Sequence, residues 1–571
     1  MRRASWVCIC CLLAACAAPE GTPNPSPREV TDPFSDVTVA VGLKHAHFSG
    51  MTGERYIVEV MGPGAGMADL DGDGDLDLLV RQGRLLQDGT TLEDALALPA
   101  DGWQPGETVL RSDWVAGNPG LRLVNRQIGL SLSDYGFGVA TGDFDRDGYE
   151  DLYLTALGPN RLLRGLGDLT FDEVTAAAGV GDSRVGTAAT FFDYDRDGWL
   201  DLYVGNYVNF SLATHKDCFG TNTAVDYCGP SSYEPEPDRL FRNRGDGTFE
   251  DVSAAAGPGL VHGAGLGVVA RDFDRDGWLD LYIANDGEDN LLWRNLGDGR
   301  FDETALQAGT AVNGRGQKEG SMGIAAADLD GDLDIDLFVT HIAEETNTLY
   351  LNDGAGSFLD STDASGLAVA SRGRTGFGVG PIDIDNDGLL DLALVNGAVR
   401  AVPGQPDPLP LRQHDQLFLN LGNARFEEIS DRAPSLSEPF EVGRALVLGD
   451  LNSDGAVDLL VTNNSAQARL LLNDGARGAH WLGVRFHDFD GGLNGHGGRA
   501  VLAAGTRRLL RYASPDGSYL SASDPRAHFG LGEQASVDRL DVTWPNGLRS
   551  RYLTPPSDRY LTVSPPRGVE K

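Results

Sequence analysis

The sequence predicts an all-β protein, namely a seven-bladed β-propeller followed by a small C-terminal β domain. The main observation is a nine-residue pattern, Asp-x-Asp/Asn-x-Asp-x-x-x-Asp, whose seven copies begin at Asp69, Asp143, Asp193, Asp272, Asp328, Asp383 and Asp450. These starts are 74, 50, 79, 56, 55 and 67 residues apart. Four short strands can be placed in each repeat. A repeated four-stranded unit is typical of a propeller, in which neighbouring blades cover both faces of every sheet.

Each repeat is predicted to hold its strands in the same order. A Phe-Asp-x-Val/Thr strand comes first, as at residues 34–38 and 171–175, and a Gly-rich apolar strand such as 136–140 follows. The acidic loop then leads into a second apolar strand such as 201–204, and a last strand such as 238–243 ends in a Gly-rich turn. Glycine before each loop allows neighbouring backbones to approach closely.

The acidic loops have the composition of cation sites. Carboxylates two residues apart converge only if the backbone turns tightly and a cation neutralises them, because two carboxylates about 4 Å apart repel by several kcal/mol. A dense set of oxygen ligands suits calcium better than magnesium. Position six is glycine in six of the seven loops, which permits the turn. Position twelve of the first copy, Val80, lies in a strand-like run, so these loops are not EF-hands.

We predict that positions one, three and five supply side-chain oxygens, position seven a backbone carbonyl, and position nine a closing carboxylate. In the first four loops these residues are Asp69, Asp71, Asp73, Asp75, Asp77; Asp143, Asp145, Asp147, Tyr149, Asp151; Asp193, Asp195, Asp197, Trp199, Asp201; and Asp272, Asp274, Asp276, Trp278, Asp280. In the last three they are Asp328, Asp330, Asp332, Asp334, Asp336; Asp383, Asp385, Asp387, Leu389, Asp391; and Asp450, Asn452, Asp454, Ala456, Asp458.

The pattern therefore predicts up to seven bound calcium ions, the alternative being acidic turns without metal. The fifth and seventh loops are expected to bind more weakly. Leu333 replaces the position-six glycine in the fifth loop, and Asn452 replaces the second Asp in the seventh.

The start of the chain predicts export. Residues 1–15 combine Arg2 and Arg3 with an apolar run, as in a signal peptide, and Leu13-Ala14-Ala15 before Cys16 resembles the bacterial lipobox. This predicts cleavage before Cys16 and its lipidation, with residues 16–33 as a flexible Pro- and Ser-rich tether. The alternative is an ordinary signal peptide cut elsewhere. We thus expect an exported lipoprotein of the bacterial cell envelope, at the outer membrane or cell surface, that contacts membrane through its lipid alone.

Cysteine usage agrees with export, and the net charge bears on the class of partner. Cys218 and Cys228 are the pair that remains after Cys16 and the signal peptide are set aside, and a disulfide is favoured over a metal site. The formal charge is −38. It becomes about −40 without Arg2 and Arg3, and about −26 with seven calcium ions bound. No cluster of Lys and Arg is present, so nucleic acid is excluded as a partner.

The loops and their Gly-rich lead-in strands resemble FG-GAP/VCBS repeats, as in integrin α-subunit propellers, over residues 34–475. The resemblance implies calcium held in loops between blade strands. The tail at 480–566 resembles the ASPIC/UnbV domain, with Phe529-Gly530-Leu531-Gly532 and Trp544-Pro545-Asn546-Gly547 as markers. The Gly-rich stretch near Asn494 departs from the usual pattern of that domain. The whole chain resembles bacterial relatives of cartilage acidic protein, which implies calcium binding and extracellular contacts.

Two insertions and several histidines are further candidate sites. Residues 206–238, which carry both Cys and several aromatic residues, are predicted either to form a partner-binding surface or to cover a blade edge or the axial channel. Residues 82–118, with Trp103 and Trp114, form a second insertion. His45 and His47 are interpreted as a pair on a blade surface. His262, His341 and His414 are interpreted as structural.

The main functional hypothesis is a calcium-binding module for adhesion or for an unknown protein or glycan ligand. No nucleophile elbow, zinc-protease motif or phosphate loop is found, so no catalytic residue is assigned. The alternatives are an enzyme acting on polysaccharide, with a carboxylate pair outside the loops, and a scaffold subunit of an envelope complex.

Overall fold

The computed structural model describes residues 32–96, 108–112, 114, 121–123, 134–220, 225–402, 405, 410–487 and 495–566. The predicted signal peptide, Cys16, most of the predicted tether and Trp103 lie outside these residues. Among the described residues, every helix is too short or too polar to span a bilayer.

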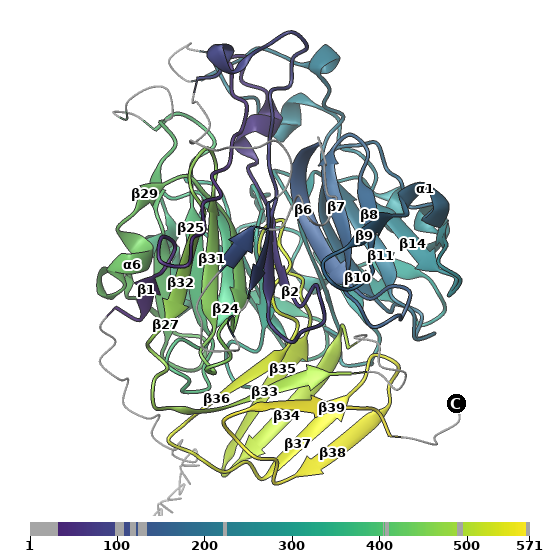
Figure 1. Ribbon diagram of the computed structural model, residues 1–571, viewed down its shortest axis with the longest axis vertical. Helices are drawn as coiled ribbons and strands as arrows, with labels where there is room; N and C mark the ends of the chain where they lie inside the picture. Colours follow the sequence, from purple (N-terminus) through teal and green to yellow (C-terminus); the bar gives the residue numbers. More distant parts are fainter. Residues whose placement is uncertain are drawn as a thin grey trace, which may run out of the picture.

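Seven antiparallel four-stranded sheets, each with one acidic loop, form the larger part of the molecule (Figure 1). The first three are β2 (Ala65–Ala68), β3 (Asp77–Val80), β4 (Thr108–Ser112), β5 (Leu121–Leu123); β6 (Tyr135–Gly142), β7 (Asp151–Leu157), β8 (Arg161–Gly165), β9 (Phe171–Glu173); and β10 (Gly186–Phe192), β11 (Asp201–Asn206), β14 (Arg239–Asn243), β15 (Phe249–Asp251). The next three are β16 (Gly265–Arg271), β17 (Asp280–Asn285), β18 (Leu291–Asn295), β19 (Phe301–Glu303); β20 (Ile324–Ala327), β21 (Asp336–Val339), β22 (Thr348–Asn352), β23 (Phe358–Asp360); and β24 (Gly376–Ile382), β25 (Asp391–Asn396), β27 (Gln416–Asn420), β28 (Phe426–Glu428).

The last of these sheets joins the two ends of the repeat region. It consists of β30 (Gly443–Gly449), β31 (Asp458–Asn463), β32 (Arg469–Asn473) and β1 (Phe34–Asp36). Phe34 of β1 pairs with Asn473 of β32, so the start of the described chain completes the sheet formed last.

Smaller elements decorate the sheets. Single-turn helices lie at α1 (Thr175–Ala178), α2 (Ser253–Ala256), α3 (Ala305–Ala308), α4 (Thr362–Ser365), α5 (Leu367–Ser371) and α6 (Pro434–Ser437). Two short ribbons pair β12 (Cys218–Phe219) with β13 (Val225–Asp226), and β26 (Gln413–His414) with β29 (Phe440–Glu441).

The innermost strands form a ring. They contact one another in the order β2, β6, β10, β16, β20, β24, β30 and back to β2. Close packing of these strands requires glycine: a Cβ at Gly138 of β6 would lie 2.4 Å from the carbonyl oxygen of Thr187 in β10. The prediction of an all-β propeller made of four-stranded units is confirmed.

Two details of the predicted repeat are wrong. The strand that starts with Phe is the outermost strand of the preceding sheet: Phe171 of β9 pairs with Gly165 of β8. Periodicity reveals the order of the strands but not where one sheet ends and the next begins. The predicted insertion at 82–118 contains β4, the third strand of the first sheet, and Trp114 is buried in the core of that region.

The C-terminal module contains two further sheets and lies at one end of the propeller (Figure 1). Its strands are β33 (His480–Phe486), β34 (Gly498–Ala504), β35 (Arg507–Ala513), β36 (Ala527–Gly532), β37 (Arg539–Thr543), β38 (Arg549–Leu553) and β39 (Tyr560–Val563). The order is β35-β34-β37-β38 in one sheet and β36-β33-β39 in the other. They enclose a separate core that includes Leu502, Phe529 and Trp544.

A segment of this module enters the centre of the ring. Residues 514–524, between β35 and β36, are called the axial plug here. Ala522 exchanges backbone hydrogen bonds with β2, at 2.9 Å with Met67 and 3.0 Å with Ala65, and Ser518 does the same with Ile324 of β20. Asp516 pairs with Arg271 of β16 at 2.6 Å.

Further bonds extend the plug's contacts to β6, β10, β24 and β30. The plug therefore bonds to all seven inner strands and occupies part of the axis.

Candidate metal centres

Each acidic loop connects an inner strand to the second strand of its sheet and uses the same turn. In six loops the position-six N–H donates to Oδ2 of the position-one Asp, at 2.8–3.1 Å. Positions four and six have positive φ in all seven loops, for example 61° at Arg196 and 92° at Gly198. This alternation turns the odd-numbered side chains inward, as the spacing predicts.

The turns bring the predicted carboxylates together. In each of the first five loops, three Asp residues place one oxygen apiece within 4.8 Å of the others. The groups are Asp69, Asp71, Asp73; Asp143, Asp145, Asp151; Asp193, Asp195, Asp197; Asp272, Asp274, Asp276; and Asp328, Asp330, Asp332.

The position-nine Asp has a structural role that the sequence pattern does not reveal. In every loop its Oδ2 accepts the position-two N–H at 2.8–3.1 Å. Its Oδ1 accepts a backbone N–H of the third strand at 2.7–2.9 Å. The residue thus fastens the loop to its own sheet, in addition to any contact with an ion.

The position-one Asp is different, because in four loops one of its oxygens has no hydrogen-bond partner among the residues that the structure describes. Buried Oδ1 atoms without a hydrogen bond belong to Asp69, Asp193, Asp272 and Asp383. A buried, unpaired carboxylate oxygen costs free energy unless a proton or a cation compensates it. The donor set therefore fits a hard cation held by the inward oxygens.

Burial and mutual repulsion raise the pKa of these carboxyls. Burial, followed by the charges of Asp197 and Asp195, raises the pKa of Asp193 to about 7. The pKa of Asp272 is raised to about 6, again chiefly by burial. A cation placed among these oxygens would favour the ionised form and oppose the shift.

The fifth and seventh loops differ from the others as the sequence suggests. Leu333 adopts φ of 76°, a strained value for a branched side chain, and the position-one Asp328 accepts its N–H bond from Gly331 instead. In the seventh loop, Oδ2 of Asp450 accepts bonds from Gly455 and from the hydroxyl of Tyr560, and Oδ1 accepts one from Asp454. Fewer free lone pairs remain there for a cation.

Comparison with known proteins agrees with this geometry. An FG-GAP-like repeat model matches residues 143–204, 226–283, 272–339 and 328–394. A model described as ASPIC and UnbV matches residues 491–570. The chain thus contains FG-GAP-like repeats followed by an ASPIC and UnbV domain.

Curated relatives share this arrangement at low identity. The chain is 26% identical over 520 residues to cartilage acidic protein 1 of Homo sapiens, covering 85% of this chain and 69% of that protein. It is also 26% identical to the Xenopus tropicalis protein of the same name, covering 72% and 61%. The chain thus spans about two thirds of the length of these relatives.

Solved structures are distant neighbours. An Agrocybe aegerita lectin specific for non-reducing terminal N-acetylglucosamine has a TM-score of 0.35 and 16% identity, covering 65% of this chain and 89% of the lectin. PorZ, a surface component of the type-IX secretion system of Porphyromonas gingivalis, has a TM-score of 0.39 and 12% identity, covering 87% and 59%.

The ASPIC and UnbV domain covers part of the loop end of the FG-GAP propeller, a contact that sequence reasoning missed. Arg511 donates to the carbonyl of Gly388 at 3.1 Å, and Arg507 donates to that of Asp387. Arg526 donates to the carbonyl of Asp450 at 2.9 Å, and His528 Nε2 lies 2.9 Å from that of Gly455. Side chains of the C-terminal domain therefore bond to the backbone of the sixth and seventh loops.

Charge was the signal that could have predicted this docking. Residues 478–571 contain twelve Lys and Arg against nine Asp and Glu, whereas residues 1–477 contain 34 and 75. A weakly basic domain after an acidic repeat region is suited to sit on its carboxylates.

Asparagines at the ends of the third strands were also missed. The Nδ2 of Asn243 donates to the carbonyls of Phe144 and Leu200, both at 2.9 Å, so it links its own loop to the loop of the preceding sheet. Asn295, Asn352 and Asn420 make the same pair of bonds. Their recurrence directly after an apolar strand was the available signal.

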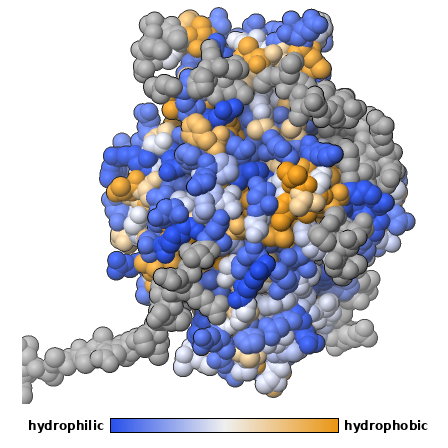
Figure 2. Space-filling model, turned by 60° about the vertical axis from the view of Figure 1, so that its left-hand side comes forward, coloured by the Kyte–Doolittle hydropathy of each residue, from blue (hydrophilic) through white to orange (hydrophobic). Residues whose placement is uncertain are grey.

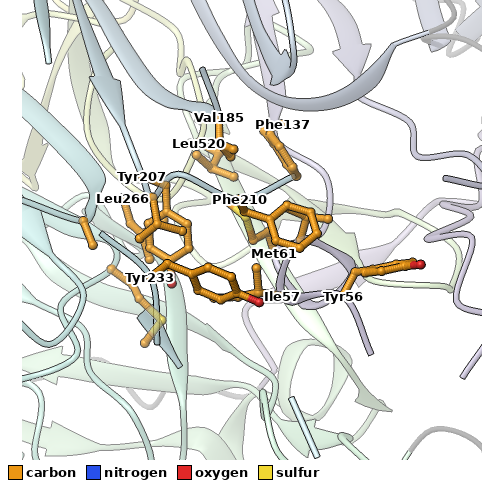
Figure 3. Packing of buried hydrophobic residues seen from close by; sticks show 14 of the residues in the cluster. Tyr56, Ile57, Met61, Phe137, Val185, Tyr207, Phe210, Tyr233, Leu266 and Leu520 are labelled. Carbon is orange, nitrogen blue, oxygen red and sulfur yellow. The ribbon is translucent and has the colours of Figure 1, made fainter. Parts of the chain in front are cut away.

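The insertion at 206–238 covers the other end of the axis. The Cys218–Cys228 disulfide is formed. Tyr207, Phe210 and Tyr233 are buried in a cluster called the aromatic cap here (Figure 3). Tyr519 of the axial plug belongs to the same cluster. Of the predicted aromatic surface, Phe219 remains 65% exposed. The channel-covering alternative describes this insertion better than the partner-binding one.

The predicted histidines differ in their burial, which shows which of them belong to the protein interior. His45 and His47 are both buried, which corrects their interpretation as a surface pair. His45 Nδ1 lies 2.6 Å from Thr108 Oγ1, and His47 Nδ1 accepts the Ser465 N–H at 3.2 Å. His341 is buried beside Ser321, whereas His262 and His414 are exposed.

Proposed function

We propose that the acidic loops bind calcium and that the ions hold the propeller in shape. The unpartnered, buried Oδ1 atoms of the position-one Asp residues carry this proposal. Positions one, three and five would supply carboxylates or amide oxygen, and position seven a carbonyl, for up to seven ions. Calcium supplies charge neutralisation and no redox chemistry. Loops one, three, four and six are the strongest sites, and loops five and seven the weakest.

We further propose that the protein is displayed outside the cytoplasm on a lipid attached to Cys16. The lipobox-like sequence and the Cys218–Cys228 disulfide support export. Calcium sites of millimolar affinity would fill only outside the cell, so folding to full stability would follow export.

The role that fits best is a rigid binding or adhesion module for a protein or glycan. The plug and the aromatic cap occupy the axis, so the outer surfaces of the blades remain for partners. Figure 2 shows a largely hydrophilic face interrupted by several hydrophobic patches, which suits reversible contacts better than permanent burial.

Metal analysis of the purified, folded protein tests the calcium proposal. The chain is equilibrated with calcium, freed of unbound ions and analysed for bound metal. We expect several calcium ions per chain, and fewer after substitution of Asp193 by Asn. A preparation that is folded in calcium-containing buffer and retains no divalent ion would rule the proposal out.

A further inference from the structure

The loops are connected to one another around the propeller by a recurring contact. The position-four residue of one loop lies against position six or seven of the next loop. The contacts are Arg146 with Trp199, Cζ to ring centroid 5.3 Å; Arg196 with Trp278, 3.8 Å; Arg275 with Asp334, N to O 3.3 Å; and Asn386 Nδ2 with the Gly455 carbonyl, 2.8 Å. The contact thus joins loops two to five in succession, and loop six to loop seven.

The contact between loops three and four is the tightest of the cation–π pairs. A Cβ at Gly277 would lie 2.7 Å from a guanidinium nitrogen of Arg196, so glycine is needed there for space as well as for its φ of 91°. The peptide that Arg196 covers is part of the candidate site. Gly277 N–H donates to Asp272 at 3.1 Å, and Trp278 N–H donates to Asp276 at 2.9 Å.

Arg196 itself belongs to loop three. It stands between Asp195 and Asp197, two candidate ligands of loop three, with a left-handed φ of 61°. A cation held by the carboxylates of loop three would neutralise them and weaken their pull on the guanidinium, which would favour its position over Trp278.

We propose that Arg196 is a positioning residue through which cation binding at loop three strengthens binding at loop four. The inference rests on the proposed calcium binding. It adds that loop three acts on loop four, and that Arg196 transmits the effect. Position four of loop five is Gly331, whose Cβ position has no atom within 4 Å, so this contact is missing between loops five and six. Coupling through position four therefore stops there.

Terbium luminescence tests the proposal, because this lanthanide replaces calcium and is excited by a nearby tryptophan. The loop-four signal is the luminescence of a chain with Trp278 minus that of the same chain with Trp278→Phe. We titrate terbium into the full-length wild type and into Asp195→Asn, which weakens loop three. Asp385→Asn is the matched control, because it removes the same ligand position from loop six.

We expect Asp195→Asn to raise the half-saturating terbium concentration of the loop-four signal about two- to fivefold, the range that one cation–π contact supplies. Asp385→Asn should leave it unchanged. In an Arg196→Ala background, Asp195→Asn should have no further effect. Circular dichroism verifies that each variant is folded during the titration.

Three results would overturn the inference. They are an unchanged loop-four signal in Asp195→Asn, equal shifts in Asp195→Asn and Asp385→Asn, and a shift that persists without Arg196. Failure of the underlying calcium proposal looks different: the wild type then binds no terbium or calcium by metal analysis.

Discussion

The two ends of the propeller axis are closed by opposite means. At the aromatic cap, buried rings such as Tyr207, Phe210 and Tyr233 pack in one cluster with Tyr519 of the plug, so apolar burial contributes most of the closure. At the loop end, buried carboxylates lie under a domain that contributes Arg507, Arg511 and Arg526. Apolar burial is stable without added ions, whereas clustered carboxylates need a counter-charge. We therefore expect the cap end to stay closed without added ions, and the loop end to depend on the proposed cations.

Chelation should have the largest effect, and it should act on the loop end. Each site that binds only the folded state contributes about 2.7 kcal/mol at a hundredfold excess of ligand over Kd, so several sites together contribute much more. We expect EDTA to lower the melting temperature strongly in differential scanning calorimetry, and excess calcium to restore it. Magnesium, added in place of calcium, is the control. An identical melting temperature with and without EDTA would contradict the expected dependence of the loop end on calcium.

The pH dependence of stability should change sign with calcium. Without a cation, the pKa values of Asp193 and of Asp450 are raised to about 7 and about 6, above the unfolded value, chiefly by burial. The folded chain then binds more protons than the unfolded chain between about pH 4 and pH 7, so its stability falls as pH rises through that window.

In calcium, protons compete with the ion and stability should rise over the same window. Urea midpoints at pH 5 and pH 7, with and without EDTA, test this prediction. Parallel trends in the two buffers would be the contrary result.

A cavity made at the cap end by substitution should lower the free energy of unfolding equally in calcium buffer and in EDTA buffer. Tyr519 is fully buried, its ring lies 4.7 Å from that of Phe377, and its hydroxyl bonds to the Met61 carbonyl. Tyr519→Ala should lower the free energy of unfolding by about 3–5 kcal/mol. Because no candidate ligand is involved, urea denaturation in calcium and in EDTA should show the same loss. A loss confined to calcium buffer would mean that the two ends are not independent.

The disulfide supports the cap end by a smaller amount. Cys218 and Cys228 are ten residues apart, and closing a loop of this length stabilises the fold by about 2–3 kcal/mol in the chain-entropy account. Replacing both by Ser should lower the urea midpoint correspondingly, with bound calcium unchanged by metal analysis. Loss of bound ions in this variant would show that the cap influences the loops.

The smallest expected effects are differences in calcium affinity between individual acidic loops. Asp193 has an unpartnered oxygen, whereas both oxygens of Asp450 accept hydrogen bonds. Asp193→Asn should weaken calcium binding at its loop about tenfold or more, through loss of a direct charged ligand. Asp450→Asn should change the calorimetric binding isotherm much less. Equal changes would mean that the two loops are equivalent sites.

The acidic loops could be predicted closely because each is local. Nine residues contain the turn and its oxygens, as Gly198 and the Asp193–Asp201 spacing illustrate. The second role of position nine, exemplified by Asp201 bonding to Asn243, could not be predicted, because it depends on strand register. The sequence left two alternatives open for residues 206–238, a partner surface and a covering loop. The burial of Tyr207, Phe210 and Tyr233 at the end of the axis favours the covering loop, and sequence features such as aromatic content could not have predicted that burial.

The sequence by itself determined the repeat, the four-stranded unit, the candidate ligands and the disulfide, since all of these depend on residues close along the chain. The tertiary structure alone decided what closes each end of the axis. The bond from Tyr519 to Met61 joins residues 458 positions apart, and the one from Tyr560 to Asp450 joins residues 110 apart. Such contacts form between surfaces that are far apart in the sequence, so the spacing of residues along the chain does not predict them.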